Sequence, residues 1–581
     1  MLKIINHFFN FCQEDNRKKF YKSIVLTFFE SLFNALRIVS IYIFINGALT
    51  GKDMTTVALI TLAVMVTSIA LSYVVRYFSV MLQTEGGYDT CARKRMEIAE
   101  HLRYVPMGYY NDKSIGQVLS VTTNTMQFLE NLATRVIMLV SSAFLSTLVI
   151  TLMILVFDYR IGIVLIAGLV VFSFITALLM KKSDEISHLK YESDETLISL
   201  ILEYIEGINE VKSYNLTGTK CRKFNDANSR ASKINYKMEA DFIPYIGFQS
   251  LAVKITGIIM IFLSVKFYLE GTMLLQDSLI MIISSFIIYA TLENASAFTA
   301  LLRNIENCVT KGEEIMKTPQ MKLDGDKKEP ENHDIEVKNV SFSYGSKQII
   351  DNVSFNIPEG TTTAIVGPSG GGKTTLTKLI ARFFDVDKGS ITLGGKDIRS
   401  YNYDTLMKNF SFVFQNVYLF KDTIADNIRF GNPEAPMEDV IAAAKKANCH
   451  DFIMSLPDGY ETVIGDDINL SGGERQRISI ARAMMKDAKV IVLDEATANV
   501  DPENEKELAT AIEQLTKDKT IIMIAHRLKT VQNADQILVV EKGRITDRGT
   551  HNELVNKEGT YKKFIEAREK AVSWKLNQSE N

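Results

Sequence analysis

Two short patterns in the C-terminal half combine residue types that could act on phosphates. The first, Gly367-Pro-Ser-Gly-Gly-Gly-Lys373-Thr374, follows the apolar run Ala364–Val366 and fits Gly-x-x-x-x-Gly-Lys-Ser/Thr. Glycines let backbone N–H groups wrap a chain of phosphates, and the helix that follows presents its positive end to them. Lys373 would reach the terminal phosphates, and the Thr374 hydroxyl would hold Mg²⁺. The pattern predicts a loop that binds a nucleotide.

The second pattern is a pair of carboxylates at the end of the apolar run Val490–Leu493. Asp494 is suited to bind Mg²⁺, directly or through water, and Glu495 to polarise an attacking water as general base. Such a pair is common in proteins and carries little weight alone, but it is specific when it follows a phosphate-binding loop. Together the two patterns predict hydrolysis of a nucleoside triphosphate.

A third pattern, Leu470-Ser-Gly-Gly-Glu-Arg-Gln-Arg477, resembles the signature sequence of ATP-binding cassette (ABC) proteins. Further motifs of that family stand before and after the signature, in family order along the chain, and each implies a role. Tyr344 would stack on adenine, Gln415 would sense Mg²⁺ and the membrane domain, and His526 would be the switch histidine. The resemblance assigns Glu495 and His526 to catalysis; Thr374, Gln415 and Asp494 to Mg²⁺; and Tyr344, Gly367, Pro368, Ser369, Gly370, Gly371, Gly372, Lys373, Thr374, Thr375, Gln415, Ser471, Gly472, Gly473 and Asp501 to ATP.

The long apolar runs and these motifs lie in different parts of the chain. Of 581 residues, 47% are hydrophobic, and the long apolar runs lie within residues 20–305. The formal charge of −3 gives no reason to expect nucleic acid as a partner. The cysteines show no metal-ligand spacing and are expected to be free thiols on the cytoplasmic side. They are Cys12, Cys91, Cys221, Cys308 and Cys449.

The apolar half is expected to cross a membrane. A bilayer core requires about 20 mostly apolar residues per helix. Six stretches meet or approach this length: 22–48, 54–82, 132–157, 160–180, 243–268 and 275–302. The two long segments between spans two and three and between spans four and five are rich in Lys and Arg, which predicts that they are cytoplasmic.

These features predict an α-helical six-span transmembrane domain fused to an α/β ATPase domain. We expect an amphipathic segment at 1–20 that lies on the inner membrane surface, with a frayed terminus as the alternative. A membrane domain is expected at 21–316, a linker at 317–334 and an ATPase domain at 335–581. The membrane half also resembles the family's exporter-type fold. Residues 106–125 look like its first coupling segment, and residues 206–214 look like the segment that leads to the second. Both regions would contact the ATPase domains.

Charged residues inside spans are costly and usually face a cavity or a partner. Glu30 and Arg37 share a face of the first span, and Lys254 lies near the middle of the fifth. Arg37 and Lys254 could line the transport path or form structural ion pairs. Arg76 and Arg135 lie nearer the cytoplasmic ends, where snorkelling of the side chain to the interface explains them.

The resemblance implies a dimer, because each ATP would lie between the phosphate loop of one chain and the signature of another. The second half-transporter could be identical or a paired homologue. Two cargoes stay open: export of a drug-, lipid- or peptide-like amphiphile, or import of a ferric siderophore. Glu474, where many relatives have Gln, resembles a siderophore-importing branch.

A third class, an ABC ATPase that does not transport, is disfavoured by the apolar spans. The Lys-, Asn- and Ile-rich composition suggests a bacterium, and hence the plasma (inner) membrane, where lipid would surround the spans.

Overall fold

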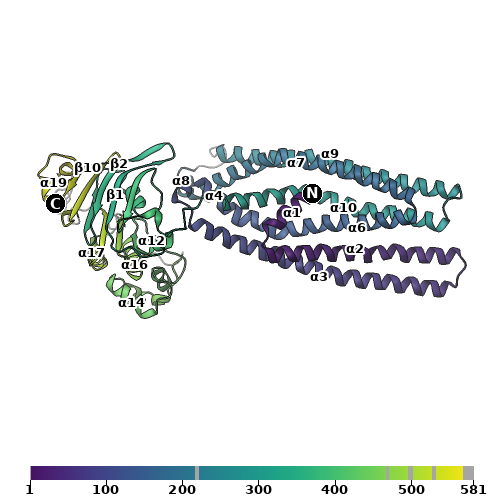
Figure 1. Cartoon of the computed structure of the whole chain (residues 1–581), viewed down its shortest axis with the longest axis horizontal. Coiled ribbons are helices and arrows are strands. Elements are labelled where there is room, and N and C mark those ends of the chain that lie inside the picture. Colours follow the sequence, from purple (N-terminus) through teal and green to yellow (C-terminus); the bar gives the residue numbers. More distant parts are fainter. Residues whose placement is uncertain are drawn as a thin grey trace. The chain divides into compact units, whose positions relative to one another are not determined.

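The computed structural model describes residues 2–110, 112–215, 222–465, 470–494, 502–525 and 531–566, with some side chains between Tyr289 and Arg303 left aside. Its contacts divide the chain into two compact units. Unit 1 comprises Met1–Arg103 and Tyr110–Pro319, and unit 2 comprises Tyr104–Tyr109 and Gln320–Asn581. Unit 1 consists of long helices, whereas unit 2 contains the strands (Figure 1).

The helices of unit 1 are much longer than a membrane requires. Helix α3 (Met54–Arg103) has 50 residues, whereas about 20 suffice to cross a bilayer core. The additional turns would therefore extend into the cytoplasm. The remaining elements are α1 (Leu2–Phe11), α2 (Glu14–Leu49), α4 (Asp112–Ser120), η2 (Val121–Thr125), α5 (Met126–Phe128), η3 (Leu129–Ala133), α6 (Thr134–Phe157), α7 (Tyr159–Glu206), α8 (Ile208–Ser213), α9 (Arg222–Leu269) and α10 (Leu275–Met316).

Among the described residues, 5 helices are long and apolar enough to cross a membrane. They correspond to the first five predicted spans. The sixth predicted span falls on α10, whose apolar stretch over described residues is the shorter Leu275–Ile288. The helical membrane domain is thus observed, and the count of six is not established by length and apolarity alone.

Helix α1 does not expose its apolar face as we expected. Ile4, Ile5, Phe8, Phe9 and Phe11 are between 1% and 7% exposed and belong to a core cluster of unit 1. The same cluster includes residues of α2, α3 and α10. The prediction that this face lies on the bilayer surface is therefore wrong, because the ends of the neighbouring helices cover it.

Unit 2 contains two sheets. One is antiparallel, with the order β2-β1-β4-β5. The other has the order β10-β9-β3-β8-β7-β6, and its strands from β9 to β6 are parallel. The strands are β1 (Ile335–Tyr344), β2 (Lys347–Ile357), β3 (Thr362–Val366), β4 (Lys388–Leu393), β5 (Lys396–Asp397), β6 (Phe410–Val413), β7 (Val490–Asp494), β8 (Thr520–Ile524), β9 (Gln536–Glu541) and β10 (Arg544–Gly549).

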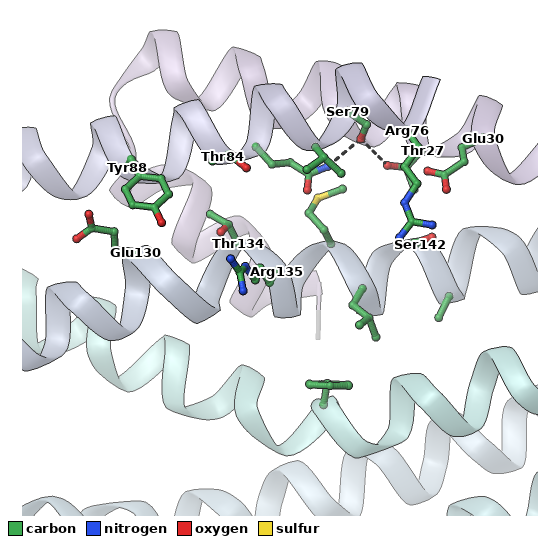
Figure 2. A pocket seen from close by; sticks show the side chains of 16 residues that line it. Thr27, Glu30, Arg76, Ser79, Thr84, Tyr88, Glu130, Thr134, Arg135 and Ser142 are labelled. Carbon is green, nitrogen blue, oxygen red and sulfur yellow. Dashed lines mark hydrogen bonds between the residues drawn. The ribbon is translucent and has the colours of Figure 1, made fainter. Parts of the chain in front are cut away.

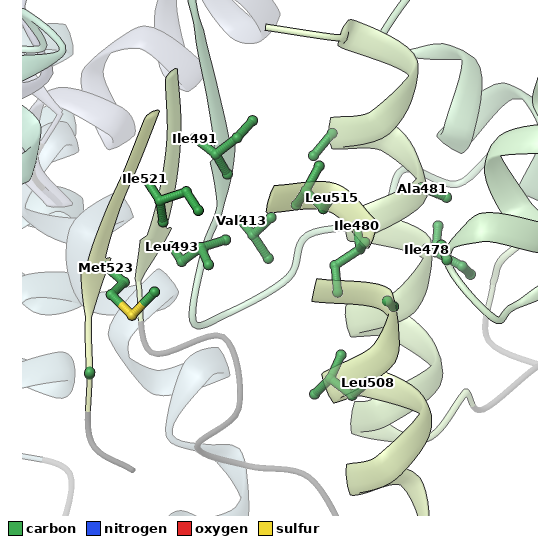
Figure 3. Packing of buried hydrophobic residues seen from close by; sticks show 14 of the residues in the cluster. Val413, Ile478, Ile480, Ala481, Ile491, Leu493, Leu508, Leu515, Ile521 and Met523 are labelled. Carbon is green, nitrogen blue, oxygen red and sulfur yellow. The ribbon is translucent and has the colours of Figure 1, made fainter. Parts of the chain in front are cut away.

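Helices cover the larger sheet and form its core with it. Figure 3 shows Leu493 and Ile521, from β7 and β8, on the side that faces Ile480 and Leu508 of the helices α16 and α17. Strands buried on both faces are typical of a parallel sheet. The helices of unit 2 are α11 (Lys373–Ile380), α12 (Tyr403–Lys408), α13 (Ile424–Arg429), α14 (Met437–Lys446), α15 (His450–Ser455), α16 (Gly472–Lys486), α17 (Pro502–Thr516) and α19 (His551–Val555).

Candidate functional site

The parallel sheet brings the nucleotide motifs to one edge. Parallel strands end at the same side of a sheet, and ligands bind in the crevice outside those ends. The phosphate loop follows β3, Asp494 ends β7, and Gln415 follows β6. Strand β8 lies between β3 and β7. The topology therefore brings the phosphate loop, Gln415 and Asp494 to one edge of the sheet, although they are far apart in sequence.

The backbone of the phosphate loop requires its glycines. Gly367, Gly370 and Gly372 have φ values of 142°, 76° and 104°, which side-chain-bearing residues rarely adopt. A Cβ added at Gly367 would lie 2.0 Å from the carbonyl oxygen of Val540. At Gly370 no atom would meet an added Cβ within 4 Å, so this side of the loop is open to a ligand.

Lys373 begins helix α11, and its ammonium lies over the loop. Its Nζ donates to the carbonyls of Gly367 and Pro368, each at 3.0 Å. A cation held above open backbone N–H groups is suited to bind phosphate oxygens. Thr374 follows on the half-buried face of the same turn. The loop, the ammonium and the hydroxyl thus fit a nucleotide with its Mg²⁺.

Tyr344 presents a partly open aromatic ring beside this loop. The residue is 39% exposed, and its ring packs edge-on against Phe342 and Phe384, with ring centres 5.0 and 5.3 Å away. Its hydroxyl lies 3.5 Å from Oγ1 of Thr375, which lies in the first turn of α11. An exposed ring fixed in this way is suited to stack on a base.

The signature sequence begins helix α16 with a capping box. The backbone N–H of Glu474 donates to Ser471 Oγ at 3.3 Å, and the Glu474 carboxylate accepts from the Ser471 N–H at 2.7 Å. This pair satisfies two N–H groups that a helix start leaves unbonded. Gly473 is buried, whereas Gly472 is exposed at the helix start. The Glu474 side chain therefore stabilises the start of helix α16.

Three predicted site residues lie outside the described residues: Glu495, Asp501 and His526. Asp494 is half-buried at the end of β7, and Gln415 is exposed after β6. The structure thus describes the phosphate loop, Tyr344, Gln415, Asp494 and the signature start.

Unit 1 contains a cavity with a volume of about 750 Å³. Helices α2, α3, α6 and the turn η3 supply most of its lining. Figure 2 shows Glu30 and Arg76 at one end, Tyr88 and Glu130 at the other, and Arg135 between them. Arg37 and Lys254 were candidates for the transport path, but neither lines this cavity.

Hydrogen-bonded side chains in the wall of the cavity join helices α2 and α3. Ser79 Oγ lies 3.1 Å from Thr27 Oγ1, and Gln83 Nε2 donates to Ser79 at 2.8 Å (Figure 2). Ser79 Oγ also lies 3.1 Å from Ser23 Oγ. Arg37 is used in a similar way, because its guanidinium donates to Ser72 Oγ at 3.1 Å. Arg37 thus supports the α2–α3 packing.

Two cations of the cavity keep their charge available for a ligand. Within the described part of the chain, neither Arg76 nor Arg135 makes a hydrogen bond or an ion pair, and both are exposed. The half-buried carboxylate of Glu30 interacts electrostatically with the guanidinium of Arg76. We had expected Arg76 and Arg135 to snorkel separately toward the interface. Residues on different helices instead line one space, which spacing along a single helix does not reveal.

Glu130 is held at the cavity by an unusual helix geometry. In η2, a π-helical turn, the Met126 N–H bonds to the carbonyls of Val121 and Thr123, so the Thr122 carbonyl loses its helical partner. Arg95 Nε donates to that carbonyl at 3.1 Å, and its Nη2 donates to Glu130 at 2.7 Å. Arg95 therefore fixes both the π turn and the carboxylate.

Comparison with known proteins agrees with both units. Residues 350–498 match the profile "ABC transporter", and residues 20–292 match "ABC transporter transmembrane region". The chain is 33% identical over 502 residues to an ATP-dependent lipid A-core flippase of Saccharophagus degradans, covering 84% of this chain and 83% of that protein. This chain belongs to the ABC transporter family.

A flippase of the same description from Vibrio cholerae is 33% identical over 484 residues, covering 80% of this chain and 81% of that protein. A bacterial Atm1-family ABC exporter with ATP bound has a TM-score of 0.84 at 22% identity, covering 95% of this chain and 98% of that one. The membrane domain therefore has the exporter fold of an ABC half-transporter.

The chain binds and hydrolyses ATP, and it couples hydrolysis to transport. It is a multi-pass protein of the bacterial inner membrane, with its ATPase domain in the cytoplasm. The relatives reported above are named as flippases, so they do not support the resemblance of Glu474 to a siderophore-importing branch.

Proposed function

We propose that this transporter exports an amphipathic, lipid-like compound with an anionic head group. The observation that carries the proposal is the pair Arg76 and Arg135, which line one cavity without ion-pair partners among the described residues. An unpaired arginine in a membrane segment is costly unless water or an anion solvates it. Arginine binds phosphate and carboxylate groups through its planar fork of donors. The flippases among the relatives support a lipid-like cargo.

For the motor we propose the roles that the motifs imply. Lys373 and the loop N–H groups bind the phosphates, and Tyr344 stacks on adenine. Thr374, Gln415 and Asp494 hold Mg²⁺, which supplies charge neutralisation at the phosphates when bound. Glu495 orients and deprotonates the attacking water, and His526 contacts the terminal phosphate.

The signature residues Ser471, Gly472 and Gly473, with Asp501, serve the ATP bound to the partner. We therefore propose a dimer of half-transporters with six spans in each. The sixth span is α10. In this arrangement ATP favours one conformation of the dimer because it binds between the two chains, and hydrolysis releases that preference.

The test uses the purified transporter in proteoliposomes with short-chain fluorescent lipids as probes. Phosphatidylglycerol carries an anionic head group, and phosphatidylcholine carries the same phosphate with a balancing cation. ATP-dependent movement of the first to the leaflet opposite the ATPase domains, measured by dithionite quenching, is the expected result. Each Arg–anion hydrogen bond contributes about 1.5–3 kcal/mol, so Arg76→Gln or Arg135→Gln should raise the half-saturating lipid fraction roughly 10-fold or more.

Arg93→Gln is the matched control, because Arg93 is half-exposed and paired with Asp89 away from the cavity. Glu495→Gln should abolish movement of every probe while it leaves ATP binding intact. Equal effects of the three arginine variants would contradict the head-group assignment. Uptake of a ferric siderophore into cells that depends on Glu495 would instead establish import.

A further inference from the structure

A second space in unit 1, the polar hollow, lies next to the cavity that Arg76 and Arg135 line. Its volume is about 610 Å³, and its charged groups are Arg95 and Glu130. The rest of its lining is uncharged and polar: Thr122, Thr123, Gln127 and Asn131. Glu130 lines the cavity as well, and Figure 2 shows it there with Tyr88. The two spaces therefore meet at the Glu130 carboxylate.

Glu130 lies at the depth of lipid head groups. It stands two residues before the predicted third span, 132–157, which is about 3 Å along a helix. The polar layer outside the apolar core of a bilayer is roughly 5–8 Å thick on each side. A lipid of the cytoplasmic leaflet thus presents its head group at the level of Glu130, where the polar hollow meets the cavity.

Arg95 is the cation of the polar hollow, and it is held there independently of Glu130. Its Nε donates to the Thr122 carbonyl at 3.1 Å, and its Nη2 donates to Glu130 at 2.7 Å. The first of these bonds uses the carbonyl that the π turn η2 leaves without its helical partner. The Arg95 side chain is 35% exposed, and a guanidinium has more donors than these two bonds use. Arg95 is therefore oriented toward an anion even when Glu130 moves away.

An unpaired Glu130 carboxylate would repel an anionic head group that moved from the polar hollow toward Arg135. The ion pair with Arg95 removes this repulsion, but it also occupies the guanidinium. A phosphate oxygen accepts from a guanidinium as a carboxylate oxygen does. Exchange of Glu130 for a phosphate at Arg95 therefore preserves the number of charge-assisted hydrogen bonds, which makes binding there reversible.

We propose that Arg95 is the first binding site for the anionic head group of a lipid, and that the Glu130 carboxylate occupies this site until a lipid arrives. This assignment rests on the cargo proposed above. Figure 2 shows Arg135 between Glu130 and Arg76, so the head group would pass from Arg95 to Arg135 and then to Arg76. Glu130 competes with the cargo for Arg95, whereas a purely structural ion pair would only support the π turn.

Glu130→Gln tests the site because these two roles of the ion pair predict different results. The amide carries no charge and competes poorly for Arg95, while the bond from Arg95 to the Thr122 carbonyl is kept. The measurement is ATP-dependent movement of fluorescent phosphatidylglycerol by the full-length transporter in proteoliposomes. A pair that is closed in roughly two-thirds of the molecules weakens apparent binding about threefold.

We therefore expect the half-saturating lipid fraction to fall about threefold or more in Glu130→Gln. In Arg95→Gln it should rise about threefold or more, because the first site is lost. Glu97→Gln is the matched control and should leave the fraction unchanged. Glu97 lies on the same helix as Arg95, pairs with Lys94 at 2.6 Å and lines neither space.

Two further probes separate the head group from other ligands. Glucosylceramide has an uncharged head group and should gain nothing from Glu130→Gln. An equal gain would overturn the inference, because the variant would then admit any lipid more easily. Free glycerol phosphate carries the anion without acyl chains. If it competed as strongly as the lipid at the same concentration, the site would belong to soluble anions and the lipid assignment would be overturned.

The remaining outcomes separate this site from the proposed cargo. A half-saturating fraction that is unchanged or raised in Glu130→Gln would overturn the inference, because the ion pair would then serve only the π turn. The proposed cargo would still stand if Arg76→Gln and Arg135→Gln weakened movement in the same assay. A wild-type transporter that moves no phosphatidylglycerol would refute the proposed cargo, and this site with it.

Discussion

Helix α1 should stabilise the membrane domain far more than a surface-bound helix could. The Phe9 ring is 1% exposed, stacks on Phe20 with ring centres 5.2 Å apart, and meets Tyr21 edge-on at 5.3 Å. Replacing a buried Phe by Ala costs about 3–5 kcal/mol, because a cavity remains. Detergent keeps part of the freed apolar surface out of water, so we expect the lower end, about 3 kcal/mol.

A loss of about 3 kcal/mol corresponds to a melting temperature lower by roughly 5 °C, because a unit as large as unit 1 has a large unfolding entropy. The assay is thermal unfolding of the detergent-solubilised transporter, followed by the fraction that remains monodisperse. Phe29→Ala is the matched control, since Phe29 is 45% exposed on α2. The reasoning is refuted if Phe9→Ala lowers the melting temperature no more than Phe29→Ala. In that case α1 would contribute little packing energy to the bundle.

Three further predictions concern other described sites. Burial raises the pKa of Cys449 to about 12, so at pH 8 its thiol should react with iodoacetamide roughly 1,000-fold more slowly than free cysteine. The pKa of this thiol is higher in the folded than in the unfolded chain, so its contribution to the free energy of unfolding is complete below about pH 9. That contribution should be lost as the pH rises toward 12. Rapid alkylation of Cys449 at pH 8 would contradict its burial. Glu474→Gln should cost no more than about 1 kcal/mol in thermal unfolding, since an amide oxygen still accepts from the Ser471 N–H and only the charge at the helix start is lost; a larger cost would show that the charge has another partner. Arg95→Gln should increase hydrogen exchange across Val121–Ala133 roughly 10-fold or more, because a charge-assisted bond at the π turn is lost, and unchanged exchange would argue against the clamp.

The nucleotide motifs could be predicted from sequence because their chemistry depends on local conformation. Gly367, Gly370 and Gly372 adopt φ values that favour glycine, so the pattern of residue types records the shape of the loop. The position of Asp494 could be predicted for a similar reason. A charged carboxylate is not left among the buried residues of a strand, so it is expected where the buried strand ends. The long helices likewise follow from apolar runs of sufficient length.

Other features depend on contacts between distant segments and could not be predicted in this way. Arg76 and Arg135 look like separate interfacial residues until α3 and α6 line the same cavity. The apolar face of α1 fits a membrane surface or a protein core equally well by composition. Arg382 belongs to none of the motifs, and only the fold shows that its side chain is buried and donates to the Lys322 carbonyl.

The membership of Tyr104–Tyr109 in unit 2 affects the order in which the protein is made. Met107 leaves the ribosome roughly 280 residues before Phe383, its hydrogen-bond partner, so at 5–20 residues per second it waits on the order of 10–60 s. During that time the segment lies between two membrane helices that are already being inserted. In the complete chain, the ATPase unit therefore folds against a segment that was made before it. A soluble fragment that begins at residue 320 would lack this segment, leaving the Phe383 carbonyl and the Phe384 ring without partners that the complete chain supplies.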